Sequence, residues 1–162
     1  MMNSEPQKEH DWLQKLVGDW TYESECVMGP GKPSQKFKGK ETVSMLGGYW
    51  MVAKGEGKMP DGGTGKMVMT IGYDPATKRY VGTWVGSMMP LMFVYNGSMD
   101  KAGKVLTLNT EGPNFTDQGK MAKFQDIIEI KSKDHRTLTS RMQGEDGKWT
   151  QFMTASYRRK KT

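Results

Sequence analysis

Residues 36–45 read Lys-Phe-Lys-Gly-Lys-Glu-Thr-Val-Ser-Met, a stretch in which every second side chain is charged or polar. The lysines fall on one face, and Phe37, Val43 and Met45 fall on the other. A period of two is typical of a β-strand that has water on one side and a core on the other. The stretch therefore predicts a strand whose second face lines a hydrophobic interior.

Similar runs follow along the rest of the chain, separated by turns rich in glycine, proline and aspartate. The strands we expect are residues 20–27, 36–45, 49–58, 66–73, 79–85, 92–99, 105–110, 120–131, 137–142 and 149–158. Residues 87–91, Ser-Met-Met-Pro-Leu, form an apolar connection between two of them. We expect this connection to be either a lid or partner-facing patch, or a crossover buried under a helix.

A helical pattern is found near the start of the chain. Trp12 and Leu16 belong to an apolar stripe within residues 8–17, and Gly18 ends it. Long antiparallel strands in sequential order tend to close, because closure removes exposed edges. We therefore expect one all-β domain over residues 1–162, an antiparallel barrel of about ten strands over residues 18–159 with a short N-terminal helix. An immunoglobulin-like sandwich is the alternative, although its strands are shorter.

Charge and cysteine usage exclude several classes of protein. The net charge is +6 at pH 7, but four of the cations belong to the run Arg158-Arg159-Lys160-Lys161. Nucleic-acid binding needs positive charge clustered through the fold, so we predict no such partner. The single Cys26 allows no internal disulfide and fits a reducing compartment. Since no apolar run approaches the ~20 residues of a membrane span, we expect a soluble, cytoplasmic protein.

The tripeptide Gly18-Asp19-Trp20 directly follows the expected helix. A glycine there ends the helix, and the indole then enters the base of the barrel. This G-x-W pattern resembles the signature of lipocalins, in which a basic residue near the last strand packs over the indole. The resemblance assigns that role to Arg158 or Arg159, through a cation–π contact.

A wider set of motifs resembles the DUF1579 family and covers essentially the whole chain. These motifs are residues 10–20, 46–50 and 71–84, Gly119-Lys120-Met121 with Phe124, and Asp146-Gly147-Lys148. That family is grouped with the calycin-type β-barrels and has no established activity. The resemblance therefore implies a calycin-like, lipocalin-type barrel, and it implies no substrate, cofactor or catalytic residue. Relatives often carry an acidic residue at position 86, where this chain has Gly86.

Glu41 lies on the apolar face of its expected strand, where an unpaired carboxylate is costly. A raised pKa, a ligand hydroxyl, or a cation such as Arg141 or Lys123 would relieve that cost, as would a place at the barrel rim. We expect the interior to bind a small apolar or amphipathic molecule reversibly. The predicted lining residues are Trp20, Tyr22, Glu41, Trp50, Trp84, Tyr95 and Met142.

Other readings of the same residues stay open. Fifteen methionines suit either an adaptable cavity or a soft, filled core. One alternative function is a cofactor-free isomerase or hydrolase with Glu41 as general base. The other is a non-catalytic interaction module, a homodimer formed through residues 87–92. Neither His10 nor His135 is expected to face the interior, and no metal-ligand cluster is visible, so no metal site, cofactor or catalytic triad is predicted.

Overall fold

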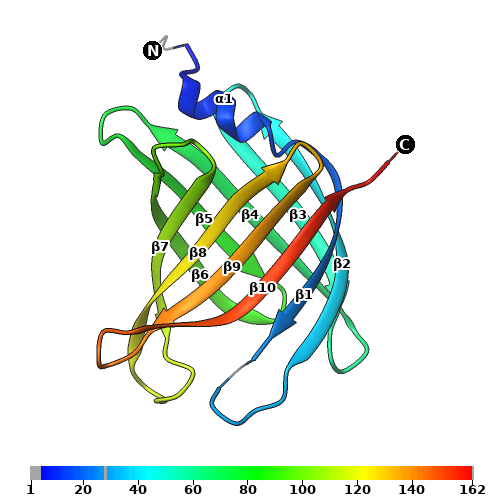
Figure 1. Ribbon diagram of the computed structural model, residues 1–162, viewed down its shortest axis with the longest axis vertical. Coiled ribbons are helices and arrows are strands. Elements are labelled where there is room, and N and C mark those ends of the chain that lie inside the picture. The colour runs from blue at the N-terminus through cyan, green and yellow to red at the C-terminus, as the bar shows by residue number, and fades with distance from the viewer. Residues whose placement is uncertain (1–4, 28, 162) are drawn as a thin grey trace.

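The computed structural model describes residues 5–27 and 29–161 (Figure 1). Its elements are α1 (Lys8–Gln14), β1 (Gly18–Cys26), β2 (Gln35–Leu46), β3 (Trp50–Lys58), β4 (Thr64–Asp74), β5 (Arg79–Gly86), β6 (Met89–Met99), β7 (Val105–Pro113), β8 (Met121–Ser132), β9 (His135–Gln143) and β10 (Trp149–Arg159). Each strand pairs with its neighbours in the sequence, and β1 pairs with β10 to close the barrel. The predicted antiparallel barrel with an N-terminal helix is confirmed.

The alternation along β2 separates water from core as expected. On the outside, Lys38 forms an ion pair with Glu23 of β1 at 3.4 Å, and Lys40 forms one with Glu56 of β3 at 3.0 Å. On the inside, Val43 is 2% exposed. The lysine face is therefore a solvated surface whose charges are balanced by the neighbouring strands.

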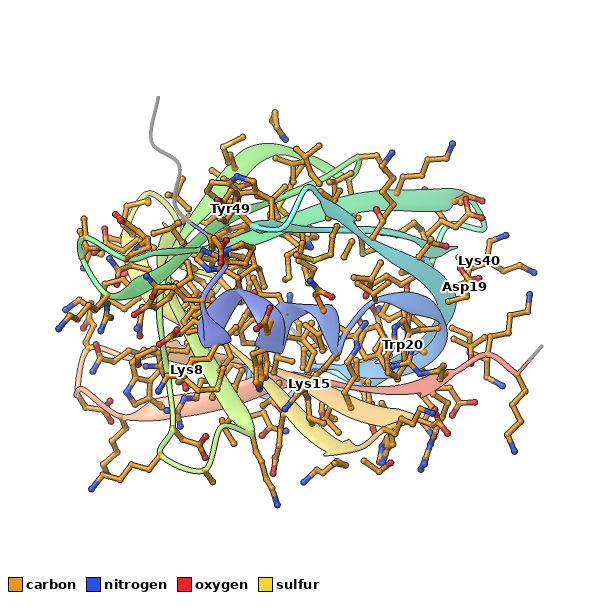
Figure 2. The ribbon with its side chains drawn as sticks, turned by 90° about the horizontal axis from the view of Figure 1, so that it is seen from above. Lys8, Lys15, Asp19, Trp20, Lys40 and Tyr49 are labelled. Carbon is orange, nitrogen blue, oxygen red and sulfur yellow. The ribbon has the colours of Figure 1, made fainter. Side chains whose placement is uncertain are left out.

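The helix α1 lies across one end of the barrel (Figure 2). Leu13 of this helix and Leu16, which follows it, are fully buried. The Trp12 indole donates a hydrogen bond of 2.6 Å to the carbonyl of Gly103, in the turn between β6 and β7. These contacts fix a helix too short to be stable alone. Among the described residues, no helix is long and apolar enough to cross a membrane.

Trp20 joins this end of the barrel to the last strand. Its indole nitrogen donates to the carbonyl of Leu16 at 2.8 Å. The guanidinium carbon of Arg159 lies 4.3 Å from the centre of the indole ring, and Arg159 also donates to the carbonyl of Val17 at 2.6 Å. Of the two arginines proposed for this role, Arg159 is the one that packs over Trp20.

The connection predicted at residues 87–91 is instead a two-residue turn followed directly by β6. Gly86 pairs with Met89, and the Ser87 amide donates to the Lys66 carbonyl at 2.8 Å. This turn lies at the end of the barrel away from α1, so the predicted crossover beneath the helix is wrong. The apolar residues that suggested a connection belong to a strand with exposed methionines.

Candidate functional site

A buried ion pair crosses the interior between β2 and β9. Arg136 donates to the Glu41 carboxylate, and their side chains are 5% and 11% exposed. The guanidinium carbon lies 4.6 Å from the ring centre of Trp20 and 4.0 Å from that of Tyr157. Burial, followed by the charge of Glu41, raises the pKa of Tyr157 well above its usual value. A carboxylate and two aromatic rings thus hold one guanidinium in place.

The predicted partners of Glu41 are wrong. Arg141 lies on the outer face, where its Nε donates to Gln125 at 2.7 Å, and Lys123 is exposed on the neighbouring strand. Arg136 was missed because the strand was expected to begin at residue 137, which left this arginine in a turn. The structural ion pair that was the alternative reading of Glu41 is the arrangement found.

A second polar cluster lies on the inner face of β8. The Tyr95 hydroxyl donates to Asp126, and the Ser140 hydroxyl donates to the other oxygen of the same carboxylate at 2.5 Å. Burial raises the pKa of the Asp126 carboxyl. Asp126 was not predicted, although it shares the parity of the buried Phe124 and Ile128. The alternation of residues along β8 was therefore sufficient to predict that Asp126 faces the interior.

The interior around the ion pair is nearly filled. The cavity beside Glu41, Arg136 and Tyr157 has a volume of about 20 Å³. Such a volume accommodates a water molecule but no larger ligand. Farther from α1, the Tyr22 ring occupies the space that a Cβ atom at Gly39 or Gly57 would need. Glycines on two strands thus make room for one protein side chain.

Aromatic rings close the end of the barrel away from α1. The rings of Trp84 and Phe93 have centres 5.9 Å apart, and those of Phe93 and Phe124 are 6.1 Å apart. Phe115, from the loop between β7 and β8, packs against Phe124 at 5.3 Å and against Phe152 at 5.0 Å. Both ends of the barrel are therefore covered by the chain's own side chains.

The predicted lining residues divide into two groups. The inward-facing group consists of Trp20, Tyr22, Glu41, Trp84, Tyr95 and Met142. Trp50 is 42% exposed and packs on the outer face against Gly72. The inward positions of β3 are those of Met51 and Ala53, so the prediction for Trp50 was off by one residue. As ligand contacts, the six inward residues stay a prediction.

A much larger hollow lies where β6 separates from β7. Within the described chain, β6 pairs with β7 over Asn96–Met99 alone, whereas it pairs with β5 from Met89 onward. The hollow has a volume of about 670 Å³. We call it the seam groove; its lining residues are Met92, Val94, Asn109, Thr110, Glu111, Lys123, Phe124, Gln143 and Trp149. Its position depends on where a strand pair ends, which the sequence pattern did not reveal.

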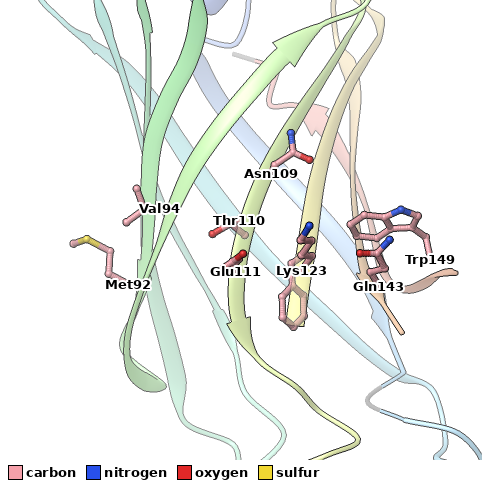
Figure 3. Close-up of a pocket in the computed structure, with 9 residues that line it drawn as sticks. Met92, Val94, Asn109, Thr110, Glu111, Lys123, Gln143 and Trp149 are labelled. Atoms are coloured by element: carbon pink, nitrogen blue, oxygen red, sulfur yellow. The ribbon is translucent and has the colours of Figure 1, made fainter. Parts of the chain in front are cut away.

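The two sides of the seam groove differ in chemistry (Figure 3). Met92 and Val94 form the β6 side and are 54% and 63% exposed. Polar side chains from β7, β8 and β9 form most of the other side, which also includes Phe124 and Trp149. Thr110 is 9% exposed, and among the described residues its hydroxyl has no hydrogen-bond partner. A buried hydroxyl without a partner is costly, so this group is available to a ligand.

A row of polar side chains spans the seam at the edge of the groove. The Asn109 amide donates to the Asn96 carbonyl at 3.1 Å and accepts from Gln125 at 2.8 Å. Gln125 in turn accepts from Arg141, whose guanidinium carbon lies 5.1 Å from the ring centre of Trp149. This row holds four strands together beside the groove. No group of three or more His, Cys, Asp or Glu suited to a metal ion occurs in the described part of the chain.

Comparison with known proteins identifies a family for this chain. The family model described as "Protein of unknown function (DUF1579)" matches residues 5–159. No curated protein matches the sequence.

Several solved structures share the fold at low sequence identity. Rv2717c from M. tuberculosis is 11% identical, with a TM-score of 0.67 over 97% of this chain and 100% of that chain. The S-type phycobiliprotein lyase CPES from Guillardia theta is 15% identical, with a TM-score of 0.60 over 97% and 99%. A de novo designed fluorescence-activating β-barrel is 14% identical, with a TM-score of 0.51 over 93% and 98%. At such identities the likeness establishes the fold alone.

Proposed function

The chain belongs to the DUF1579 family, and on that premise we propose that it is a barrel that reversibly binds a small amphipathic molecule at the seam groove. The observation that carries this proposal is the groove itself. Its volume of about 670 Å³ lies within the range of ligand pockets, roughly 300–1,000 Å³. The interior cavity of about 20 Å³ is far below that range.

The lining of the groove supports an amphipathic ligand. Phe124 and Trp149 add apolar surface to the exposed Met92 and Val94. Apolar walls supply most of the binding free energy of such sites, whereas a few polar groups orient the ligand. The unpartnered Thr110 hydroxyl is the clearest polar group of this kind.

The predicted interior residues lie directly behind the groove. Met142 pairs with the groove residue Phe124, and the Trp84 ring contacts Phe93, which in turn contacts Phe124. A ligand that displaced the Phe124 ring would reach Trp84 and Met142 first. Two of the solved structures with this fold are named as a phycobiliprotein lyase and a fluorescence-activating barrel, which accords with a binding role for the scaffold.

Glu41 is a poor candidate for a general base. Its carboxylate is engaged by Arg136 in a space that holds no more than a water molecule. A substrate would have to enter a filled interior and displace that ion pair. We therefore place no reaction at Glu41.

Homodimerisation is the second candidate function. Residues 89–99 of β6 carry no charged side chain, and Met89, Met92 and Val94 are exposed on it. Strands of this kind are ordinarily protected by charges or covered, so this surface is suited to a second copy of the chain. Such a dimer would be broken by a charge at Met89.

Native mass spectrometry of protein purified from its own host tests the proposal. A reproducible added mass of small-molecule size supports binding, and Val94→Lys should abolish it by charging the apolar wall. Leu46→Lys is the matched control, since Leu46 is 67% exposed on β2 against 63% for Val94. Bare protein at the dimer mass would favour the second candidate. An added mass that survives Val94→Lys would place the ligand outside the seam groove.

A further inference from the structure

We propose that the ligand of the seam groove carries an uncharged, hydroxyl-rich head, such as a sugar or polyol, joined to an apolar tail. This inference rests on the proposed function and names the chemical class that the groove selects. It follows from the charge balance of the lining, from its mixture of donors and acceptors, and from the apolar side that β6 provides.

The groove contains one negative and one positive side chain, and the two do not form an ion pair with each other. Glu111 and Lys123 stand opposite each other in the register of β7 and β8. Among the described residues, neither forms an ion pair or a side-chain hydrogen bond, so both remain available. An anionic head would be attracted by Lys123 but repelled by Glu111, and the reverse holds for a cationic head, so a charged head gains no net attraction. An uncharged head with hydroxyl groups can form hydrogen bonds with both residues without meeting a like charge.

The polar groups require a ligand that both donates and accepts. Glu111 accepts hydrogen bonds, whereas Lys123 donates them. The Gln143 amide nitrogen is engaged by the Gly147 carbonyl at 3.0 Å, which leaves the side-chain oxygen of Gln143 as an acceptor. The Thr110 hydroxyl acts either way. Neighbouring hydroxyl groups on one ring match this set, because each hydroxyl is both a donor and an acceptor.

The apolar side of the groove indicates that the remainder of the ligand is an apolar tail. Met92 and Val94 lie on β6, and Asn109, Glu111, Lys123 and Gln143 lie on the other side of the groove (Figure 3). Phe124 and Trp149 add aromatic surface to the lining. Trp149 adds an indole whose ring is held by Arg141 at 5.1 Å. An alkyl or aryl tail would pack on the β6 side while the head remains over β7, β8 and β9. A free sugar without a tail would leave that apolar surface in water.

Four probes with the same hexyl chain test the head group: hexyl β-D-glucoside, hexanol, heptanoate and hexylammonium. Titration of the full-length protein, followed by backbone amide NMR, gives each affinity and its site. We expect the glucoside to bind at least about tenfold more tightly than the other three, the gain typical of one charge-assisted hydrogen bond. Equal affinities for glucoside and hexanol would overturn the head-group inference and leave the proposed function standing. No binding by any of the four would overturn both.

A pair of variants separates the head from the tail. Glu111→Leu should weaken the glucoside about tenfold and leave hexanol unchanged. Glu23→Leu is the matched control, an exposed glutamate on β1 that is paired with Lys38 away from the groove. A loss of glucoside affinity that is the same in both variants, or absent in Glu111→Leu, would contradict the inference.

Discussion

Arg136 donates to the Glu41 carboxylate across the inside of the barrel, and the two residues are 95 positions apart in the chain. The pair joins β2 to β9, strands that are not neighbours in the barrel. It lies between the Trp20 and Tyr157 rings, under the end that α1 covers. The arrangement fills the space in which a ligand was predicted, and it leaves a cavity of about 20 Å³ there, against about 670 Å³ in the seam groove.

Glu41→Gln should lower the free energy of unfolding by about 3 kcal/mol, because it leaves the Arg136 charge buried without a counter-charge. Urea unfolding at neutral pH measures the effect. Glu23→Gln, which breaks the exposed pair with Lys38, should cost no more than about 0.5 kcal/mol.

A double variant tests the cause of that loss. Glu41→Leu combined with Arg136→Met removes both charges and retains apolar volume, so it should be more stable than Glu41→Gln alone. A double variant as unstable as the single one would show that the pair matters for a reason other than charge burial.

Arg159→Ala should lower the free energy of unfolding by about 2 kcal/mol. The substitution removes the contact with Trp20 and the hydrogen bonds to the carbonyls of Val17 and Lys15, which end the helical segment. Loss of these contacts beside α1 should also speed hydrogen exchange at Trp12 and Leu16. Lys160→Ala, one residue later, is the control and should change neither quantity. Unaltered exchange in Arg159→Ala would show that the helix docks without this arginine.

The buried Asp126 should make stability fall as the pH rises. Burial raises its pKa in the folded protein, so the folded state binds this proton more tightly than the unfolded state does. Its stabilising contribution is present below the unfolded pKa and is lost as the pH rises through the raised, folded pKa. Asp126→Asn removes that titration while retaining partners for Tyr95 and Ser140.

The difference between Asp126→Asn and the unaltered protein isolates this group. We expect the variant to gain relative stability as the pH increases between about pH 3 and pH 8, measured by urea unfolding at each pH. A difference that is constant over that range would mean that Asp126 titrates alike in both states.

The sequence predicted the barrel because its alternation is local and repeated in every strand. The lysine face of β2 predicted the solvated surface, and the Gly18-Asp19-Trp20 motif limited the partner of Trp20 to Arg158 or Arg159, of which the structure has Arg159. Partners across the barrel were harder to predict, because parity tells which side chains face inward and not which of them meet. Glu41 was therefore recognised as buried while its partner Arg136 was missed.

The seam groove depends on information that no single strand contains. Its walls come from five strands, and it exists because β6 pairs with β7 only from Asn96 onward. The pattern along β6 resembles that of any strand, with Met92 and Val94 alternating with Phe93. Their exposure follows from the loss of a neighbouring strand, which is a tertiary property. The error at Trp50 has a local cause. The predicted alternation along β3 was displaced by one residue, so Trp50 was assigned to the inner face although it lies on the outer one.

Thr110→Val should raise stability and weaken ligand binding at the same time. Valine has nearly the same shape, and it removes a buried hydroxyl that has no partner in the described chain, for a gain of about 1 kcal/mol. The same hydroxyl is the polar group that the proposed ligand would use, so affinity should fall about tenfold. Thr107→Val, on the same strand outside the groove, should leave affinity unchanged. A Thr110→Val protein with undiminished affinity would show that the ligand gains no binding free energy from a hydrogen bond to this hydroxyl.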